Sequence, residues 1–418
     1  MAELLAFTKK IGCNRSVAKN TPTQAPKSAR TLFLASAVTT VIALFVHGYL
    51  YSQHLALDVG QATKSMCDIN EVFSCSAVAA SKFSTLFGIP VALWGFIANF
   101  GFLVLLGIYP LTESGREQIA RRNLLIVSGA IALASVIMGV IAFTQMSQYC
   151  LFCMAAYLLS FLNFLFIWLA NRKPAGNILG APVFSPKDLT PIVVIAIAGF
   201  LGGFVADSSM KKSSGSEGLD TQARGLVEEW KSGVVRDIKV VDPLVKGASV
   251  ETAKMTIVEF ADFRCIHCKH AAPVIKAFAS AHPDVRVEFQ PWPLDGECNA
   301  SISQSNGVSC LLARVVWCAE KNKKTGWAAH DYLFELNEPP MSTAQVEAAY
   351  PAMQSLTQLS PQEMKTCADS DDAKKVVRSQ AEAGSALQIQ GTPAIYANKK
   401  SLPGGQTLPV LKAAYGSL

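Results

Sequence analysis

Charged residues are scarce in this sequence of 418 amino acids. Asp, Glu, Lys and Arg make up only 16% of it, against about a quarter in an average soluble protein. The deficit falls almost wholly in the first half, and half of all residues are apolar. The formal net charge of +6 is modest, so we expect no nucleic-acid partner. The length allows two or three domains.

The uncharged stretches of the first half are long enough to cross a lipid bilayer as helices. We predict spans at residues 31–50, 89–109, 124–146 and 150–170, and a shorter fifth span at 191–206. We expect no cleaved secretory signal, because the first apolar run begins near Thr31 and is long enough to persist as a membrane helix. The bilayer is therefore an expected partner.

Lys and Arg are also unevenly placed, and this predicts the orientation. The N-terminal tail holds six of them and the loops after the second and fourth spans hold three each. The loop after the first span holds two, and the turn after the third holds none. Because positive loops stay in the cytoplasm, we expect a cytoplasmic N-terminus. Five spans then place every cysteine except Cys13 at the outer face or beyond it.

Shifts in composition divide the chain into five segments. We predict a cytoplasmic tail at 1–30, a membrane domain at 31–171, and a loop with the fifth span at 172–206. A flexible linker is expected at 207–239, because residues 207–218 are rich in Ser, Gly and Lys. The soluble composition that follows predicts a globular domain at 240–418.

The eleven cysteines are grouped in a way that suggests redox work in an oxidising compartment. Two Cys-x-x-Cys pairs, Cys150/Cys153 and Cys265/Cys268, each begin a predicted helix. The positive end of a helix dipole favours a thiolate there. The alternative is that the cysteines are buried structural residues. The two pairs lie too far apart for a zinc ribbon, so we predict no metal.

The second pair follows an apolar, β-prone segment at 255–263 and precedes a helix, and a Thr-Pro pair precedes a late strand. FADFRCIHC and GTPA make residues 240–418 resemble the thioredoxin-like, DsbA-type disulfide oxidoreductases. The resemblance implies that Cys265 is the nucleophile and Cys268 the resolving thiol. It also assigns supporting roles: His267 favours the thiolate, Glu259 is a buried proton acceptor, and Thr392 and Pro393 present backbone to a substrate. Ile266 departs from the family's usual Pro.

Four further cysteines of this domain, Cys298, Cys310, Cys318 and Cys367, admit three pairings. Cys298 and Cys310 bracket a Ser/Asn/Gly loop, and the other two lie in predicted helical segments. We expect the structural disulfides Cys298–Cys310 and Cys318–Cys367.

The membrane half carries a second set of residues at characteristic positions: Cys67, Cys75-Ser76, the run FGIPVALWG from Phe87, and Cys150-x-x-Cys153 with Tyr157. On these, residues 31–171 resemble the vitamin K epoxide reductase family in its bacterial form, fused to a thioredoxin-like domain. The resemblance implies a four-helix bundle around a quinone, which the Cys150/Cys153 pair faces. Candidate quinone-binding residues are Tyr157, Ser84, Phe87, Trp94 and Phe152. The aromatic ones could equally be packing residues.

Together these features predict a fold class: an α-helical membrane bundle, with a four-helix core and a fifth connecting span, followed by an α/β thioredoxin-like domain with a helical insertion. The predicted function is a quinone-dependent thiol oxidase of the bacterial inner membrane, with the thioredoxin-like domain in the periplasm or outside. Electrons would pass from reduced exported proteins to Cys265/Cys268, to Cys67/Cys75, to Cys150/Cys153, and then to ubiquinone or menaquinone. Within the loop pair, we expect Cys75 to exchange with Cys265 and Cys67 with Cys150.

Two alternatives use the same residues. The chain could reduce a quinone epoxide with electrons from its own thioredoxin-like domain, although Ser84 stands where the animal enzyme has an asparagine. It could also be a non-enzymatic, membrane-anchored binding module with inert disulfides.

Overall fold

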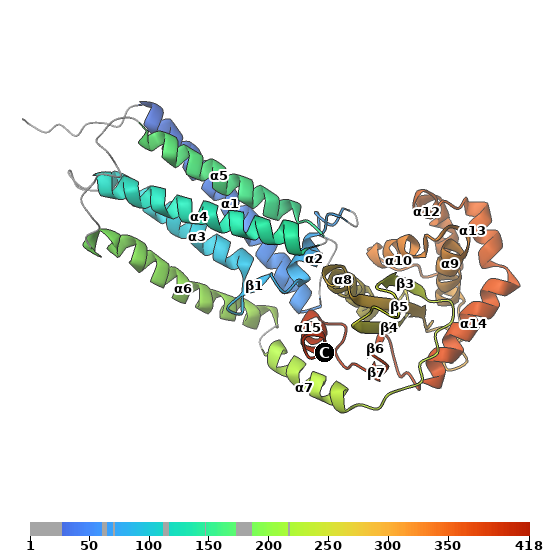
Figure 1. Cartoon of the computed structure of the whole chain (residues 1–418). Coiled ribbons are helices and arrows are strands. Elements are labelled where there is room, and N and C mark those ends of the chain that lie inside the picture. Colours follow the sequence, from blue (N-terminus) through green and yellow to red (C-terminus); the bar gives the residue numbers. More distant parts are fainter. Residues whose placement is uncertain are drawn as a thin grey trace, which may run out of the picture.

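The computed structural model of the protein describes residues 27–60, 65–69, 72–111, 117–146, 148–172, 186–215 and 218–418. They form an elongated helical bundle joined end-on to an α/β domain (Figure 1). Most of the predicted cytoplasmic tail, with Cys13, lies outside the described residues.

Five helices of the described chain are long and apolar enough to cross a membrane, so the chain is a multi-pass membrane protein. They are α1 (Lys27–Asp58), α3 (Val91–Ile108), α4 (Glu117–Gln145), α5 (Leu151–Asn171) and α6 (Pro186–Ser214). The predicted spans lie within or close to these helices. Three helices are clearly longer than their predicted spans: α6 extends beyond residues 191–206 at both ends, α4 begins before residue 124, and α1 continues past residue 50, where Tyr51, Leu55 and Leu57 remain buried.

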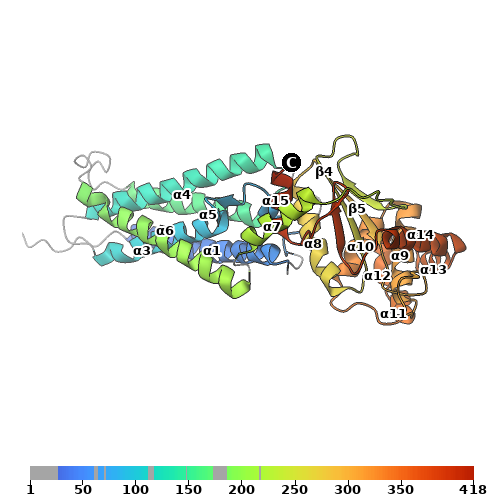
Figure 2. The same ribbon diagram turned by 90° about the horizontal axis from the view of Figure 1, so that it is seen from below.

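Within the bundle, α1 packs between α3 and α5, and α4 covers both of these neighbours. Helix α6 lies against α3 at the edge of the bundle (Figure 2). Gly199 and Gly203, one turn apart on α6, receive the side chain of Ile97 from α3, and a Cβ at either glycine would collide with it. Small residues four apart allow such close approach of helices in lipid, so the fifth span is tightly attached to the four-helix core.

Between α1 and α3 the chain forms a short helix, α2 (Cys75–Ala80), and a small hairpin of β1 (Thr85–Leu86) with β2 (Ile89–Pro90). The hairpin turn places Phe87 and Gly88 at positive φ. Helix α3 therefore begins two residues later than the span predicted at 89–109, because Ile89 and Pro90 form strand β2 of the hairpin.

The α/β domain is built on one five-stranded sheet of order β3-β5-β4-β6-β7. The strands are β3 (Leu244–Gly247), β4 (Met255–Ala261), β5 (Val285–Pro291), β6 (Ala394–Ala397) and β7 (Lys400–Ser401). Only β4 and β5 are parallel, and α8 (Ile266–Ala281) connects them. The final helix is α15 (Leu408–Gly416). This is the thioredoxin-like fold that the sequence predicts.

A helical insertion between β5 and β6 completes the domain. It contains α9 (Val308–Lys323), α10 (Gly326–Glu335), α11 (Thr343–Ala348), α12 (Tyr350–Thr357), α13 (Pro361–Ala368) and α14 (Asp371–Ala386). The disulfides Cys298–Cys310 and Cys318–Cys367 form here, in the expected pairing. The second disulfide links α9 to α13 across the insertion.

The expected flexible linker at 207–239 is largely helical. Helix α6 continues to Ser214, and α7 (Leu219–Ser232) follows almost at once. Helix α7 is amphipathic: Ala223, Val227 and Trp230 are buried, and the Trp230 indole N–H donates to the Ala397 carbonyl of β6 at 3.0 Å. The prediction of a linker rested on the small and polar residues of 207–218. It overlooked the apolar stripe of α7, which packs the segment against the α/β domain.

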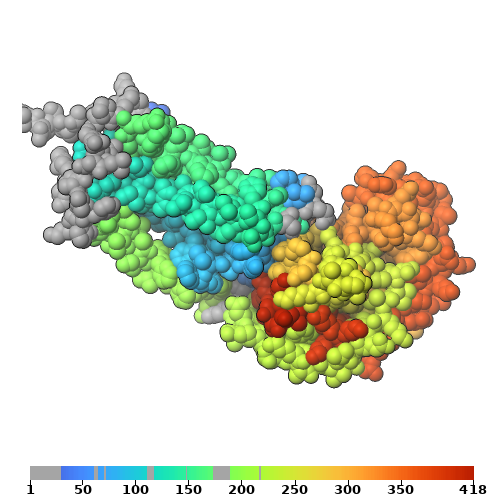
Figure 3. All heavy atoms as spheres, viewed as in Figure 1, coloured from blue at the N-terminus to red at the C-terminus, as the bar shows by residue number. Residues whose placement is uncertain are grey.

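The two parts meet where the end of α1 and α2 contact α8 and α15 (Figure 3). Leu57 of α1 and Ala80 of α2 belong to the same buried cluster as Ala271, Val274 and Ile275 of α8. The Lys412 ammonium of α15 donates to the Ser84 hydroxyl at 3.4 Å. The bundle therefore buries part of the face of the α/β domain that carries α8.

Candidate functional site

The first Cys-x-x-Cys pair is placed by the start of α5. Cys150 is the N-cap residue, in an extended conformation, and its sulfur accepts a hydrogen bond from the Cys153 backbone N–H at 3.1 Å. N-cap side chains satisfy backbone donors that have no partner within the helix. A thiolate at Cys150 would therefore meet both a hydrogen-bond donor and the positive end of the helix.

A long-range backbone pairing brings the loop before α2 to the same point. Phe73 bridges Tyr149, with the Ser74 N–H donating to the Tyr149 carbonyl at 3.0 Å and the Tyr149 N–H donating to the Val72 carbonyl at 2.8 Å. This pairing aligns the residue before Cys150 with the residues before Cys75. The sequence alone carries no signal for it, because the partners are 76 positions apart.

Asp68, next to Cys67, fixes the start of α2. Its carboxylate accepts from the Ser74 hydroxyl at 2.9 Å and from the Ser76 backbone N–H at 3.0 Å. The Tyr49 hydroxyl of α1 holds the other side of the loop through Ser65 and the Met66 N–H. Asp68 was not singled out in the sequence, although its position beside a loop cysteine is the type of place where a carboxylate caps a turn.

These restraints gather three sulfur atoms. Cys67 and Cys75 form a disulfide, and the Cys75 sulfur lies 3.1 Å from that of Cys150. All three side chains are buried. We expected Cys67 to exchange with Cys150, but it is the Cys75 sulfur that contacts Cys150, because the bridge to Tyr149 ends directly before α2. The three sulfurs lie within 4.8 Å of one another, but the disulfide leaves no pair of loop thiolates for a metal.

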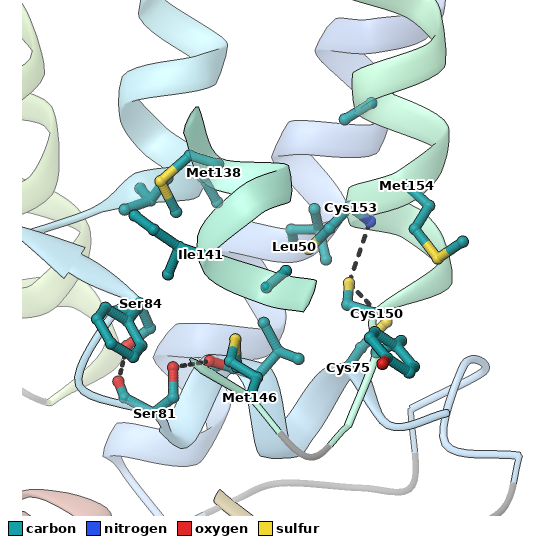
Figure 4. A pocket seen from close by; sticks show the side chains of 18 of the residues that line it. Leu50, Cys75, Ser81, Ser84, Met138, Ile141, Met146, Cys150, Cys153 and Met154 are labelled. Carbon is teal, nitrogen blue, oxygen red and sulfur yellow. Dashed lines mark hydrogen bonds between the residues drawn. The ribbon is translucent and has the colours of Figure 1, made fainter. Parts of the chain in front are cut away.

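A cavity of about 110 Å³ opens beside this cluster. In Figure 4, Cys75, Cys150 and Cys153 lie on one side of it and Ser81 and Ser84 on the other. The rest of the wall is mostly apolar and comes from α1 to α5, with Leu50, Val78, Met138, Ile141, Phe143 and Met154 among its residues. An apolar cavity with few polar groups is typical of a small-molecule site.

The structure separates the five predicted quinone-binding residues into two groups. Tyr157 and Ser84 line the cavity. Phe87 is 84% exposed at the hairpin turn, Trp94 donates its indole N–H to the Leu86 carbonyl, and Phe152 packs on Tyr49. These three do not line the cavity. Phe87 is exposed, and the other two pack elsewhere. Their spacing along the chain could not distinguish these surroundings from a place in the cavity wall.

His47 of α1 lines the cavity and was not among the predicted site residues. Its ring sits against Gly95 of α3, where any Cβ would collide with it. The Nδ1 atom is buried and has no hydrogen-bond partner among the described residues. A buried polar atom without a partner is costly, so His47 offers a hydrogen bond to whatever fills the cavity. This fits a quinone, which presents carbonyl oxygens on an apolar ring.

The second Cys-x-x-Cys pair begins α8, with Cys265 as the N-cap residue. Cys265 is half-buried, and as a thiol it donates to the Thr392 carbonyl at 3.3 Å. The hydrogen bond from the Cys268 thiol lowers the pKa of Cys265 to about 5, and the Thr392 side chain and the backbone N–H groups of His267 and Cys268 add to this. The buried Thr392 hydroxyl has no other partner among the described residues, so it is free to donate to a thiolate.

The inner cysteine of this pair has the opposite environment. Cys268 is fully buried, and burial raises the pKa of its thiol far above the usual value. Glu259 of β4 is also buried, and desolvation raises the pKa of its carboxyl to about 8. Its Oε1 atom has no hydrogen-bond partner among the described residues. Glu259 interacts electrostatically with Cys268, as a proton acceptor for this thiol would.

The two remaining predicted residues of this site are placed by different elements. The Thr392–Pro393 peptide bond is cis and lies directly before β6, which pairs with β4. That pairing brings Thr392 to Cys265. His267 is exposed in the first turn of α8, and it stabilises the Cys265 thiolate through its backbone N–H. The expected action of a charged His267 side chain on the thiolate stays a prediction.

Comparison with known proteins identifies both parts. Residues 34–168 match the vitamin K epoxide reductase family, and residues 256–416 match the DSBA-like thioredoxin domain. Over 167 residues the chain is 26% identical to disulfide bond formation protein D of Bacillus subtilis, covering 38% of this chain and 71% of that protein.

Two solved structures are each similar to part of this chain. BdbD from Bacillus subtilis, in its oxidised form, is 22% identical, with a TM-score of 0.37 over 44% of this chain and 97% of that one. A periplasmic thioredoxin-like protein from Salmonella enterica serovar Typhimurium is also 22% identical, with a TM-score of 0.34 over 42% of this chain and 89% of that one.

Proposed function

We propose that this chain, an oxidoreductase that joins a vitamin K epoxide reductase family domain to a DSBA-like thioredoxin domain, makes disulfide bonds in exported proteins and passes the electrons to a membrane quinone. The observation that carries the proposal is the line of sulfur atoms at the cavity. The loop disulfide Cys67–Cys75 lies 3.1 Å from Cys150, and Cys153 lines the cavity itself. Each neighbouring pair in this line is placed for thiol–disulfide exchange.

Electrons enter at the thioredoxin-like domain. A reduced client thiolate attacks the Cys265–Cys268 disulfide at the half-exposed Cys265, and the second client thiol completes the client's disulfide. Cys265 is then released as a thiolate, which its low pKa of about 5 stabilises at neutral pH. A stabilised thiolate makes the disulfide form a stronger oxidant, as a disulfide-forming domain requires.

The loop pair carries the electrons to the bundle. The Cys265 thiolate attacks Cys67, which forms a mixed disulfide and releases Cys75 as a thiolate. Cys75 then attacks Cys150 of an oxidised Cys150–Cys153 pair, and Cys153 leaves as a thiolate at the cavity wall. Cys268 attacks Cys265 of the first mixed disulfide and releases Cys67, which attacks Cys75, so that the loop disulfide re-forms and Cys150 leaves as a thiolate. We assign Cys67 rather than Cys75 to Cys265 because Cys75 already faces Cys150. The direct packing of α2 on α8 keeps the two domains together, so exchange does not depend on a diffusing partner.

The acceptor, ubiquinone or menaquinone, would lie in the apolar cavity. When bound, it supplies a two-electron acceptance that side chains lack. Cys153 would face its ring, while the His47 Nδ1 and the Tyr157 hydroxyl are the polar groups available to its carbonyl oxygens. The Ser84 hydroxyl lines the cavity too, but it donates to the Ser81 carbonyl at 2.8 Å. The apolar side chains from α4 and α5 keep bulk water from the reacting sulfur.

Mass spectrometry of trapped intermediates tests the relay. In Cys268→Ala, the resolving thiol is missing, so we expect a disulfide-linked peptide that joins Cys265 to Cys67. The matched control is the double variant Cys268→Ala with Cys67→Ser, which should lose that peptide. A link to Cys75 in the single variant would reverse the loop assignment. Absence of any link to the loop would refute the electron route between the domains. The same preparation can be supplied with a quinone or with a quinone epoxide. Measuring the hydroquinone formed from the first and the quinone formed from the second distinguishes the two activities.

The proposed location is the bacterial cytoplasmic membrane, with the N-terminus in the cytoplasm and the thioredoxin-like domain outside. Its support is the distribution of Lys and Arg and the presence of five spans. A reporter enzyme that works only outside the cytoplasm should be active when it is fused after Leu418. Cys13 should react only with a membrane-permeant thiol reagent. Labelling of Cys13 by an impermeant reagent in intact cells would refute this orientation.

A further inference from the structure

A second cavity lies at the same end of the bundle as the redox cavity and differs from it in character. Its volume is about 160 Å³, and its polar lining residues are Asp58, Ser208, Lys211 and Asp220. Ser208 and Asp220 are exposed, so this cavity is in contact with solvent. The redox cavity is mostly apolar, and the two share no lining residue.

The last two turns of α1 form the wall between the two cavities. His54 lines the redox cavity and Asp58 lines the polar one. They are four positions apart on one helix face, and the His54 Nε2 atom lies 3.5 Å from the Asp58 Oδ2 atom. His54 is only 4% exposed. This pair therefore joins the apolar cavity to the solvated one through two titratable side chains.

Charged groups from three elements surround the pair. Lys211 of α6 binds Asp207 at 2.8 Å, and Asp207 accepts from the Tyr51 hydroxyl at 2.9 Å. Lys412 of α15 acts electrostatically on both His54 and Asp58, as does Lys211. The carboxylates of Asp220 (α7) and Asp207 repel a negative charge on Asp58. The thioredoxin-like domain thus supplies part of the setting for a pair that belongs to the bundle.

The proposed reaction needs a group beside the redox cavity that can accept and donate protons. Oxidation of the Cys150 and Cys153 thiols to a disulfide releases two electrons and two protons, and reduction of a quinone to the hydroquinone consumes both. The overall step is balanced, but the protons and electrons do not move together. A thiol loses its proton before its sulfur attacks, and an oxygen of the acceptor gains a proton only as the electron pair arrives.

We propose that His54 and Asp58 form a proton relay between the solvated cavity and the redox cavity, with His54 exchanging protons inside and Asp58 exchanging them with solvent. The inference rests on the proposed quinone reduction and assigns a catalytic residue, His54, and a positioning and relay residue, Asp58. General acid–base groups of this kind contribute about 100-fold or more to a rate.

The test uses the purified full chain, a short-chain benzoquinone as the acceptor and a reduced dithiol peptide as the client. Asp58→Asn should lower the single-turnover rate of quinone reduction about 100-fold and raise the solvent deuterium isotope effect. Small weak acids such as formate should restore the rate, and Asp58→Glu should keep most of it. His54→Gln should lower the rate in the same way. The matched control is Asp284→Asn, since Asp284 accepts from the Tyr415 hydroxyl but lines neither cavity.

Two further measurements separate a relay from a structural role. The dissociation constant of the quinone and the redox equilibrium of Cys150/Cys153 with glutathione, the latter measured without quinone, should be the same in Asp58→Asn as in the wild type. An unchanged rate would overturn the relay. So would a lowered rate accompanied by weaker quinone binding or a shifted redox equilibrium, or one that weak acids do not restore. A wild-type protein that reduces no quinone would instead refute the proposed function.

Discussion

The two Cys-x-x-Cys pairs begin their helices in the same way but face different surroundings. Cys150 and Cys265 are both N-cap residues in an extended conformation. Cys150 is buried against the loop disulfide, whereas Cys265 is half-buried and its neighbour Ile266 is exposed. The inner cysteines differ as well: Cys153 lines an apolar cavity, and Cys268 is sealed in beside Glu259. The motif provides the exchange chemistry, and the surroundings select its partner.

This difference matches the two tasks that we propose for the pairs. A pair that oxidises other proteins needs an exposed nucleophile and a protected resolving thiol, as at Cys265 and Cys268. A pair that delivers electrons to a small apolar acceptor needs its outer cysteine within reach of another protein disulfide and its inner cysteine on the acceptor's cavity. The sulfur of Cys75 lies 3.1 Å from that of Cys150, so the outer cysteine of the membrane pair is within reach of the loop disulfide.

Removing the inner cysteine of the membrane pair should give the largest effect. Cys153→Ser should lower quinone reduction roughly 1,000-fold or more, as expected for loss of a covalent catalyst. Exchange between Cys265 and the loop should continue, since it does not involve Cys153. Ser160→Ala, on the same helix but away from the cavity, is the control and should behave like the wild type. Stopped-flow absorbance of the quinone measures both. Near-normal turnover in Cys153→Ser would show that the two pairs do not differ as described.

A smaller effect is expected from the acid beside the soluble pair. Glu259→Gln should slow the attack of Cys268 on a mixed disulfide at Cys265 about 100-fold, as for loss of a general base. Because the carboxyl has a pKa of about 8, it becomes a carboxylate as the pH rises through that value. The wild-type rate should therefore increase between about pH 7 and 9, and the variant should not show this increase.

Glu288→Gln is the matched control, because Glu288 lies on the adjacent strand and pairs with Arg286 rather than with a cysteine. Quenched-flow thiol trapping measures the rates. If Glu259→Gln kept the pH-dependent increase, the proton acceptor would be a different group.

The smallest expected effect concerns the hydroxyl of Thr392. A pKa of about 5 at Cys265 means that its alkylation by iodoacetamide should rise with pH, reach half its maximum near pH 5 and be constant above about pH 6. Thr392→Val removes one donor to the thiolate and should move this midpoint upward by about one pH unit, since a hydrogen bond to a charged group contributes about 1.5 kcal/mol. Thr392→Ser keeps the hydroxyl and should keep the midpoint. Equal midpoints in the Val and Ser variants would mean that the Thr392 hydroxyl does not stabilise the thiolate, and that Cys268 and the helix start lower the pKa without it.

Much of the architecture could be predicted because its causes are local. The length of an uncharged run determines whether a helix can span a bilayer, and so each of the five predicted spans overlaps one apolar helix, although some helix ends differ by up to eight residues. The alternation of strand, Cys-x-x-Cys and helix is likewise local, and it located β4, α8 and the Thr-Pro before β6. The pairing of Cys298 with Cys310 was also accessible, since the two residues bracket one short loop.

The linker, the cavity lining and the order of the loop cysteines were not predictable in this way. Helix α7 packs on β6 through Trp230, a contact between residues 167 positions apart. Phe87, Trp94 and Phe152 are close in sequence to cavity residues but point to other surroundings, because neighbouring helix and hairpin positions face different sides. His47 lines the cavity where its ring packs against Gly95 of α3, a contact between two helices that the sequence does not show.

The sequence by itself determined which segments are long and apolar enough to cross a membrane, that a thioredoxin-like domain follows them, and which cysteines are candidates for disulfide exchange, because run length, periodicity and residue chemistry are local properties. Only the tertiary structure decided that Cys75 rather than Cys67 faces Cys150, that Ser84, Tyr157 and His47 share one cavity, and that His54 and Asp58 stand between that cavity and solvent. These relations arise where helices far apart in the chain pack together, since packing rather than sequence spacing sets the distance between their side chains.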